Sequence, residues 1–163
     1  SVYMDILNRA KDYVYIMTPY MIMDGELENS LTFSAERGVD VRIILPHISD
    51  SFVAQALAKT HYKKLLDAGV KVYEYTPGFV HAKVFVSDDV KSVVGSINMD
   101  YRSLYHHFEC ATYMYGTRCI EDIKSDYKDT LAKCQQVTYE SIKNDKWYIK
   151  LIGKVLKFVA PLI

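Results

Sequence analysis

The sequence has no excess of charge of either sign, since 20 lysines and arginines are balanced by 20 aspartates and glutamates over 163 residues. A domain that binds nucleic acid usually carries a clear positive excess, because it must neutralise a row of phosphates. The balance therefore argues against a dedicated nucleic-acid binder, and we expect no nucleic acid among the partners.

Cysteine is scarce as well. The chain has three, an odd number without a CxxC pair: Cys110, Cys119 and Cys134. A disulfide scaffold is therefore not expected, and a reducing compartment fits this usage better. We expect all three to be buried side chains without a covalent partner.

Long apolar runs are missing too. No run in the sequence reaches the roughly 18 residues that a membrane-spanning helix needs, and the start lacks the pattern of a signal peptide. Repeats, linkers and low-complexity stretches are also lacking. What is present is a chain that is half apolar, of single-domain size and long enough to bury a core.

Strand-like and helix-like segments alternate along this chain. The predicted strands are apolar or β-branched runs at residues 13–17, 39–45, 70–75, 82–87, 92–96 and 108–115. The predicted helices cover residues 4–12, 25–37, about 50–68 and 119–134. Asp24 is expected to cap the second helix and Ser49 or Asp50 the third, with Gly38 and Gly69 closing them. The alternation predicts an α/β fold, with a mostly parallel, mixed sheet flanked by helices on both faces.

Residues 146–163 differ in composition, because they contain four lysines and no acidic residue. The lysines recur every three or four residues, opposite an apolar stripe of Trp147, Leu151, Val155, Phe158 and Leu162. We therefore divide the chain into a main domain, 1–145, and a basic amphipathic tail, 146–163. Such a helix suits the surface of an anionic membrane. A surface helix that packs its apolar side on the domain would show the same stripe.

Residues 81–98 contain the most specific pattern in the chain. His81, Lys83 and Asp88 form HxKxxxxD, and a GSxN segment from Gly95 to Asn98 follows. HxKxxxxD alone would arise by chance in about one chain of this length in a hundred. A GSxN segment at a fixed offset makes the combination far rarer, so the two together carry the functional argument.

These residue types suit chemistry at a phosphate. His81 and Lys83 alternate on a predicted strand and so project to one face. An imidazole can attack phosphorus or protonate a leaving alkoxide near neutral pH, and Lys83 supplies positive charge for the non-bridging oxygens. Ser96 and Asn98 can donate hydrogen bonds to the phosphate, and Gly95 lets the backbone approach it. No metal or other cofactor is expected, because these donors stabilise the charge.

A nucleophilic histidine also needs an acidic partner that holds its ring in one tautomer. Glu109, on the strand predicted after GSxN, is the candidate. His106, His107 and Glu109 could be taken for a metal cluster, but adjacent residues of an extended segment point to opposite faces. We therefore expect no metal site, and we expect His47 and His61 to be ordinary surface residues.

The two motifs together resemble the signature of the phospholipase D superfamily. Further segments are similar to those of bacterial cardiolipin synthases: Thr18-Pro19-Tyr20, residues 37–42, Ala68-Gly69-Val70, residues 78–81, residues 100–103, Phe108-Glu109 and Ala160-Pro161-Leu162. Those enzymes carry two such motifs in one chain, whereas this chain has one and its tail resembles their C-terminal end. The resemblance implies the second catalytic half of such an enzyme, with a phospholipase D-like α/β/α sandwich.

What this resemblance implies for the chemistry is specific. Two halves meet about a pseudo-two-fold axis, and each contributes a histidine. One histidine becomes a phosphohistidine, while the other protonates the leaving glycerol and then activates the incoming hydroxyl. In cardiolipin synthases this converts two phosphatidylglycerols into cardiolipin and glycerol. The implied catalytic set is His81, Lys83, Asp88 and Glu109, and the implied phosphate-binding set is Lys83, Ser96 and Asn98.

Some of these residues carry qualifications. Asp88 tends to be structural in this family, facing away from the phosphate, and we expect the same here. Family members often have asparagine where His107 stands, which leaves His107 without an assigned role. Which histidine attacks and which alcohol accepts the phosphatidyl group are not fixed by the sequence, and plain hydrolysis stays open.

The implied partners are phosphatidylglycerol, an anionic membrane surface, and either the first half of the same enzyme or a second copy of this domain. The implied location is the cytosolic face of a bacterial cytoplasmic membrane. Because one motif is half of an active site, we expect the isolated chain to be inactive or weak.

Two other functions stay open. A single-motif phosphodiesterase, phospholipase or nuclease would homodimerise, so that two copies of His81 meet across a two-fold axis. A phosphate- or lipid-binding module would have no activity of its own.

Overall fold

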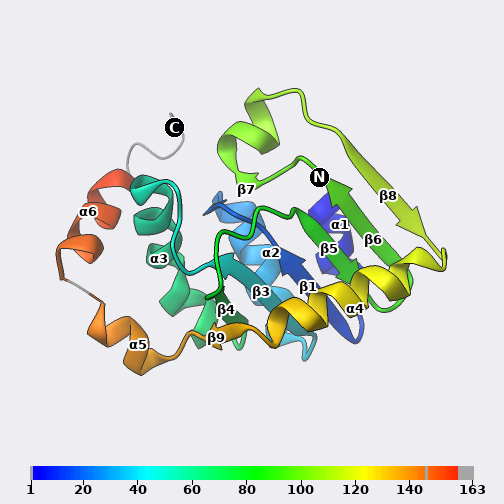
Figure 1. The fold of residues 1–163 in the computed structure, drawn as a ribbon, viewed down its shortest axis with the longest axis horizontal. Coiled ribbons are helices and arrows are strands. Elements are labelled where there is room, and N and C mark those ends of the chain that lie inside the picture. The colour runs from blue at the N-terminus through cyan, green and yellow to red at the C-terminus, as the bar shows by residue number, and fades with distance from the viewer. Residues whose placement is uncertain (1, 146, 158–163) are drawn as a thin grey trace.

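The structure is a computed structural model that describes residues 2–145 and 147–157, and a seven-stranded sheet lies at its centre (Figure 1). The strand order is β8-β6-β5-β1-β3-β4-β9, with bounds Ala111–Tyr115, Lys91–Gly95, Val84–Ser87, Tyr13–Met17, Asp40–Pro46, Lys71–Tyr75 and Cys134–Gln136. The central strand β1 is buried along its whole length. Because both of its faces are covered, it reads as a continuous apolar run in the sequence.

Parallel pairing occupies the centre of the sheet. β1 pairs in parallel with β3, and β3 with β4. Helices α2 (Gly25–Glu36) and α3 (Phe52–Asp67) connect these strands, as parallel neighbours require a crossover. Antiparallel pairing adds β5, β6 and β8 on one side and β9 on the other.

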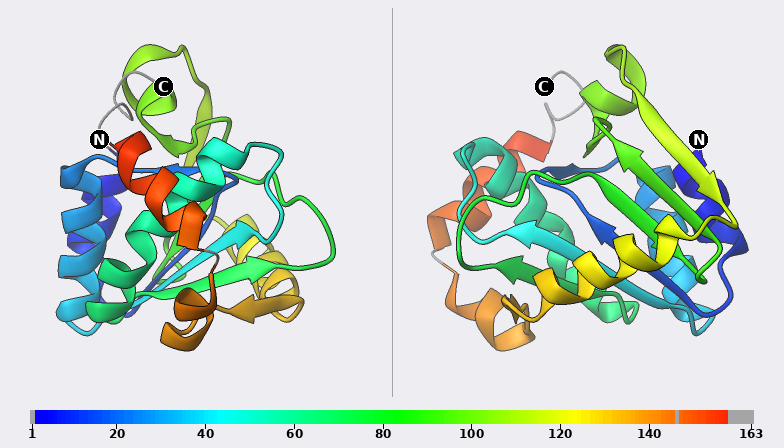
Figure 2. Two further views of the ribbon diagram at one scale, coloured as in Figure 1. Left: turned by 90° about the vertical axis from the view of Figure 1, so that its left-hand side faces the viewer. Right: turned by 45° about the vertical axis from the view of Figure 1, so that its right-hand side comes forward.

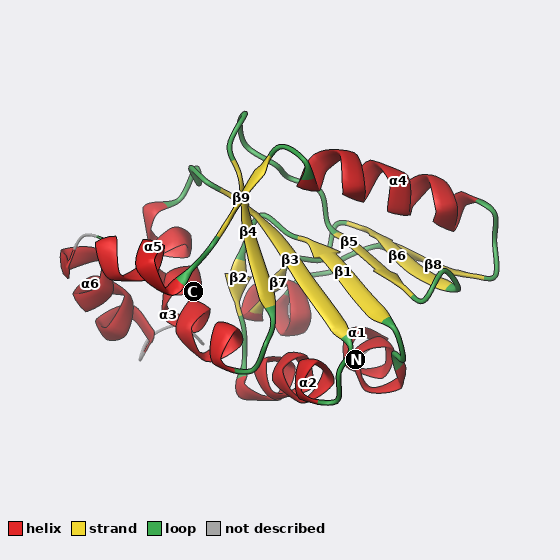
Figure 3. Cartoon of the chain, turned by 90° about the horizontal axis from the view of Figure 1, so that it is seen from below, coloured by secondary structure: helices red, strands yellow, loops and turns green. Residues whose placement is uncertain are grey.

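Helices cover both faces of the sheet (Figure 3). α1 (Val2–Arg9), α2 and α3 enclose the larger core, which includes Leu7, Ile16 and Leu65. α4 (Cys119–Leu131) encloses a second core on the other face, where Tyr127 is fully buried. This arrangement confirms the predicted α/β sandwich of a mixed sheet flanked by helices.

The helix ends follow the predicted capping with one correction. The Asp24 side chain accepts a hydrogen bond from the Leu27 N–H at 2.7 Å, and Gly38 and Gly69 take φ values of 94° and 91°. The third helix, however, is capped by Ser51 rather than by Ser49 or Asp50. Asp50 has another partner, described below.

Several elements were not expected from the sequence. The two-residue strands β2 (Met21–Ile22) and β7 (Met99–Asp100) pair in parallel as a second small sheet. A π-helix, η1 (Arg102–His106), follows β7, so His106 is helical rather than extended. The last predicted helix ends at Leu131 rather than at Cys134, which begins β9 instead. The β2–β7 pair matters most, because it brings the segment after Pro19 beside the end of GSxN.

The cysteines are free, as predicted, but they are less buried than predicted. Cys110 and Cys119 are exposed and Cys134 is half-buried. The first lies just before β8, the edge strand of the sheet, and the second lies at the start of α4.

Beyond β9 the chain forms α5 (Tyr139–Asn144) and α6 (Trp147–Lys157), and α6 lies along α3 (Figure 2). Lys146 and residues 158–163 of the predicted tail lie outside the described residues. The side chains of Lys150, Lys154 and Lys157 do so too, and the predicted basic face therefore stays a prediction. Within the described part of the chain, every helix is too short or too polar to cross a bilayer.

Candidate active site

His81 and Lys83 lie in the loop that joins β4 to β5, just before β5 begins. The prediction that they alternate within a strand is therefore wrong, yet the two side chains still meet. The Lys83 Nζ lies 3.0 Å from each ring nitrogen of His81 and donates to the His81 carbonyl oxygen at 2.8 Å. The imidazole of His81 and the positive charge of Lys83 therefore lie side by side. This arrangement suits a reacting phosphate.

Acidic groups from three separate segments act on Lys83. Partial burial lowers the pKa of Lys83, and the negative charges of Glu109, Asp100 and Asp50 oppose this shift. Glu109 precedes β8, Asp100 ends β7 and Asp50 precedes α3. Segments far apart in the sequence are therefore brought together around the cation.

Two aromatic rings flank His81. The ring of Phe79 lies 5.4 Å from that of His81, and the ring of Tyr20 meets it edge-on at 6.3 Å. The Tyr20 hydroxyl oxygen lies 2.9 and 2.8 Å from the two carboxylate oxygens of Asp50 and donates its one proton to this carboxylate. Burial and this carboxylate raise the pKa of Tyr20 to about 12, so Tyr20 remains a neutral donor. The imidazole is exposed, but its orientation is restricted on two sides.

Asp88 lies at the other end of β5 from Lys83. Its carboxylate accepts hydrogen bonds from the backbone N–H groups of Lys11, Asp12 and Tyr13 at 3.0, 3.0 and 2.9 Å. Four strand residues separate it from Lys83, which amounts to more than about 10 Å. Its inclusion in the catalytic set is therefore corrected: Asp88 ties the β5–β6 turn to the start of β1, in line with the expected structural role.

Gly95 has a role in strand packing, whereas a role at the phosphate was predicted. A Cβ at this position would lie 2.3 Å from the Cys110 carbonyl oxygen and 2.5 Å from the Ala111 Cα. The absence of a side chain therefore allows the backbones of β6 and β8 to approach each other, rather than the backbone and a phosphate.

Ser96 and Glu109 are joined by this close approach. The Ser96 hydroxyl donates to Glu109 Oε2 and accepts from the Cys110 N–H at 3.1 Å. A hydroxyl has one proton to donate, and here Glu109 and the Cys110 carbonyl oxygen at 3.2 Å are its acceptors, while the phosphate contact of Ser96 stays a prediction. Glu109 Oε1 in turn lies 3.9 Å from Nδ1 of His107. Among the described residues Glu109 therefore has His107 as a histidine neighbour, and the expectation that Glu109 orients a catalytic histidine stays a prediction.

Asn98 lines a pocket of about 340 Å³ that lies beside Tyr20. Its side-chain oxygen is buried and has no hydrogen-bond partner among the residues that the structure describes. Asp100, Arg102 and Glu109 also line this pocket. A buried polar atom without a partner is costly, and such atoms call for a functional explanation. The pocket therefore contains the unpaired Asn98 oxygen, a guanidinium and carboxylates, and the ring of Tyr20, which also lines it, contacts His81.

Sequence reasoning missed part of this environment. Tyr20 and Asp50 orient each other beside His81, and the Asp100 carboxylate accepts from the Ser103 N–H at 2.7 Å at the start of η1. The Asp100–Ser103 spacing is typical of a helix N-cap and could have been recognised. The Tyr20–Asp50 contact joins two loops and has no local signal in the sequence.

The expectation that His47 and His61 are ordinary surface residues is wrong for His61 and correct for His47, which is exposed. The side chain of His61 is 3 % exposed, and its Nδ1 lies 2.8 Å from Glu28 Oε1. Lys64 binds the other oxygen of Glu28 at 2.8 Å, so the three side chains join α2 to α3. Nδ1 of His47 lies 2.7 Å from Glu74, which is buried.

Comparison with protein-family models connects this site with known chemistry. Residues 3–131 match the model described as cardiolipin synthase, PLD-like domain. This chain belongs to that family. The match extends from α1 to the end of α4 and includes both motifs as well as Glu109.

The PLD-like domain has close relatives among bacterial proteins. It is 64 % identical, over its full length, to 35 % of an uncharacterized protein of Streptococcus mutans. It is 32 % identical, again over its full length, to 32 % of the cardiolipin synthase of Halalkalibacterium halodurans. The chain therefore spans about a third of the length of the relatives that it matches.

Solved structures support the same fold. The phospholipase D family member Nuc from Salmonella typhimurium superposes with a TM-score of 0.72 and 19 % identity, over 83 % of this chain and 88 % of Nuc. The phosphatidylserine synthase of Haemophilus influenzae superposes with a TM-score of 0.79 and 13 % identity, over 99 % of this chain and 44 % of that one.

Proposed function

We propose that this PLD-like domain supplies one of two histidines that transfer a phosphatidyl group between two molecules of phosphatidylglycerol, giving cardiolipin and glycerol. The observation that carries the proposal is the position of the Lys83 ammonium, 3.0 Å from both ring nitrogens of His81. Family membership and the relatives named as cardiolipin synthases support the choice of substrate.

The reaction divides into two displacements. In the first, one histidine attacks the phosphorus of a phosphatidylglycerol and the bond to the terminal glycerol oxygen breaks, while the other histidine gives its proton to that oxygen. In the second, the now neutral histidine takes a proton from the hydroxyl of another phosphatidylglycerol, whose oxygen displaces the first histidine. His81 takes one of these roles, and a histidine of the first half takes the other.

The neighbouring groups stabilise charge and orientation in this scheme. Lys83 faces the non-bridging phosphate oxygens, and the side-chain NH2 group of Asn98 donates a hydrogen bond from the pocket wall. Ser96 acts through Glu109, which it holds. These steps need charge and hydrogen bonds only, all from side chains of the two halves.

The proposed location follows from the substrate. Phosphatidylglycerol is an anionic lipid, so the domain would work at the cytosolic face of a bacterial cytoplasmic membrane. Its partner in the complete site would be the first half of the same enzyme.

The test supplies the other half of the proposed two-histidine active site. The chain is co-expressed with the N-terminal half of a cardiolipin synthase, and cardiolipin formed from phosphatidylglycerol is measured for the unmodified chain, His81→Ala and His106→Ala. His106 is an exposed histidine of η1 and serves as the matched control. We expect activity to disappear in His81→Ala and to persist in His106→Ala.

Other results would change the assignment. Equal cardiolipin formation by the unmodified chain and His81→Ala would remove His81 from the chemistry. Turnover of a phosphodiester by the chain alone, sedimenting as a dimer, would favour the homodimeric enzyme in place of the two-half synthase.

A further inference from the structure

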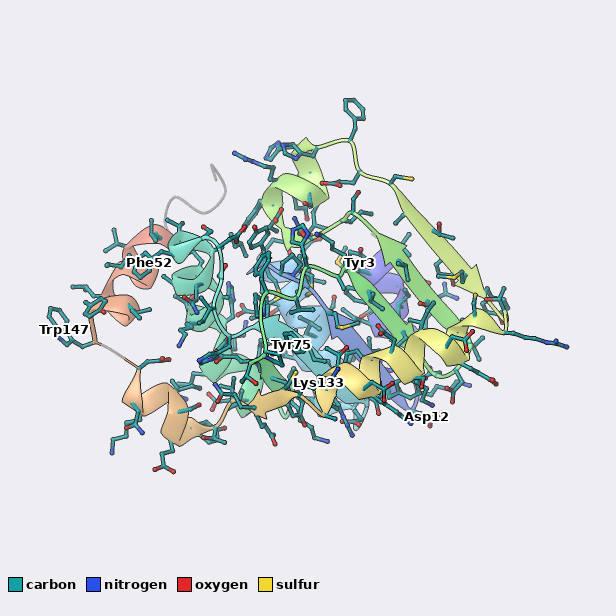
Figure 4. All side chains as sticks on the ribbon, viewed as in Figure 1. Tyr3, Asp12, Phe52, Tyr75, Lys133 and Trp147 are labelled. Carbon is teal, nitrogen blue, oxygen red and sulfur yellow. The ribbon has the colours of Figure 1, made fainter. Side chains whose placement is uncertain are left out.

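Helix α6 presents a row of apolar side chains to solvent. Trp147, Leu151 and Val155 recur every four residues, and 74, 54 and 62 % of their surfaces are exposed. Tyr148 and Ile152 beside them are exposed as well. Figure 4 shows Trp147 at the outer margin of the molecule, beyond the ribbon of α6. Single exposed apolar residues are ordinary, but a contiguous set on one helix marks a contact surface.

The inner face of α6 is already in use. Gly153 is buried, and a Cβ there would lie 2.6 Å from the Ala56 carbonyl oxygen and 2.8 Å from Thr60 Cγ2. The helix backbone therefore contacts α3 directly. Leu156 packs on the same side, against Leu57 and its neighbours. Because this close contact fixes the rotation of α6, the outer row is not available to the core of the domain.

The composition of α6 indicates what covers the outer row. Between Trp147 and Lys157 the sequence has three lysines and no acidic residue, although the whole chain is neutral. The eleven described residues of α6 extend over about 16 Å, roughly half of a bilayer core, and this described stretch is too short to span one. A short basic helix with aromatic and aliphatic residues on one exposed face suits the plane of an anionic lipid surface.

The end of α6 is also next to the candidate site. Leu156 belongs to a small apolar cluster with Tyr20, Ile22, Ala54 and Tyr101. These four residues line the pocket that contains Asn98, and the ring of Tyr20 meets His81. The end of α6 therefore packs on a cluster whose members also line the pocket where the phosphodiester is proposed to react.

We propose that α6 docks the domain on an anionic lipid surface, with Trp147, Leu151 and Val155 inserted among the headgroups beside the active site. The choice of a lipid partner rests on the proposed function, because a site for a lipid phosphodiester must meet the lipid at the membrane. The docking step itself involves no chemistry, so it can be measured separately from catalysis.

Trp147 makes the test direct, because it is the only tryptophan of the chain. Its fluorescence is followed while residues 1–163 are titrated with vesicles of phosphatidylglycerol or of phosphatidylcholine, with and without brominated lipid. We expect a blue shift and bromine quenching with phosphatidylglycerol vesicles, weakened by salt, and much less of both with phosphatidylcholine.

A matched pair of variants tests the surface itself. Leu151 and Phe33 are each 54 % exposed, but Phe33 lies on α2. We expect Leu151→Glu to weaken binding to phosphatidylglycerol vesicles about tenfold or more and Phe33→Glu to bind like the unmodified chain. Circular dichroism checks that both are folded, and quenching in the unmodified chain tests the docking without any variant.

The outcomes separate this proposal from the proposed function. Normal vesicle binding by His81→Ala with no cardiolipin formation supports both. Normal binding by a reconstituted enzyme that forms no cardiolipin contradicts the proposed function alone. No spectral change with phosphatidylglycerol vesicles, or undiminished binding by Leu151→Glu, overturns the docking. A dimer in sedimentation that Leu151→Glu dissociates, without vesicle binding, would overturn it in favour of contact between copies.

Discussion

The hydroxyl of Ser96 donates to the carboxylate of Glu109, thirteen residues further along the chain. The Cys110 N–H donates back to the Ser96 oxygen at 3.1 Å, and the Ser96 N–H donates to the Cys110 carbonyl oxygen at 2.9 Å. GSxN and Glu109 therefore form one unit across β6 and β8. Any role of Glu109 at a histidine, in this half or in its partner, depends on how Ser96 holds it.

The first prediction concerns this unit. Ser96→Ala removes a hydrogen bond to a charged group, a loss of about 1.5–3 kcal/mol, and we expect kcat to fall about tenfold or more with KM little changed. Ser96→Thr keeps a hydroxyl and should recover most of the activity. Steady-state kinetics of the reconstituted two-half enzyme provides the measurement. A raised KM at constant kcat would instead show that Ser96 binds the phosphate directly.

The second prediction concerns the unpaired oxygen of Asn98. Because that atom is buried without a partner, Asn98→Ala should leave the free energy of unfolding unchanged or raise it by about 1 kcal/mol, while activity falls. Urea denaturation and the cardiolipin assay are compared with Asn8→Ala, at an exposed position of α1. Clear destabilisation by Asn98→Ala would mean that Asn98 supports the fold rather than the substrate.

The third prediction concerns Gly95. Gly95→Ala places a methyl group against the Cys110–Ala111 backbone, and we expect it to lower the free energy of unfolding by about 2 kcal/mol. Gly25→Ala is the control, since a Cβ there meets nothing within 4 Å. Its effect should stay within about 0.5 kcal/mol. Similar unfolding curves for both variants would contradict the close approach of β6 and β8.

The fourth prediction concerns the pH dependence of stability. The hydrogen bond with His61, supported by Lys64 and opposed by burial, lowers the pKa of Glu28 from 4.5 to about 2. A carboxyl group whose pKa is lowered by folding stabilises the protein above its unfolded pKa, and this contribution disappears as the pH falls through the folded pKa. The stabilisation should therefore be complete above about pH 4.5 and lost between there and pH 2.

This prediction is checked by the difference in unfolding free energy between the unmodified chain and Glu28→Gln, measured from pH 6 downward. We expect the difference to shrink below about pH 4.5 and approach a constant near pH 2. Glu36→Gln, at an exposed position of the same helix, should show no such change. A difference that is independent of pH would mean that Glu28 contributes no charge interaction.

Much of the fold follows from local patterns. The buried run of β1, the Asp24 cap and the two glycines at helix ends depend on neighbouring residues, so their signals are present in the sequence. The motif spacing likewise indicated that the side chains of His81 and Lys83 lie together, as they do in the structure. These parts were predictable because the chemistry or the backbone geometry is fixed within a few residues.

What only the tertiary structure decided are contacts between segments distant in the chain. In the folded chain the length of β5 separates Asp88 from Lys83, and the Ser96 hydroxyl donates to Glu109. Tyr20 and Asp50, from two different loops, lie beside His81. It also set which face of α6 contacts α3 and which remains exposed. The periodicity of the sequence records helical spacing only, so it does not distinguish the buried apolar face of α6 from the exposed one. The close packing of Gly153 on α3 determines which face remains exposed.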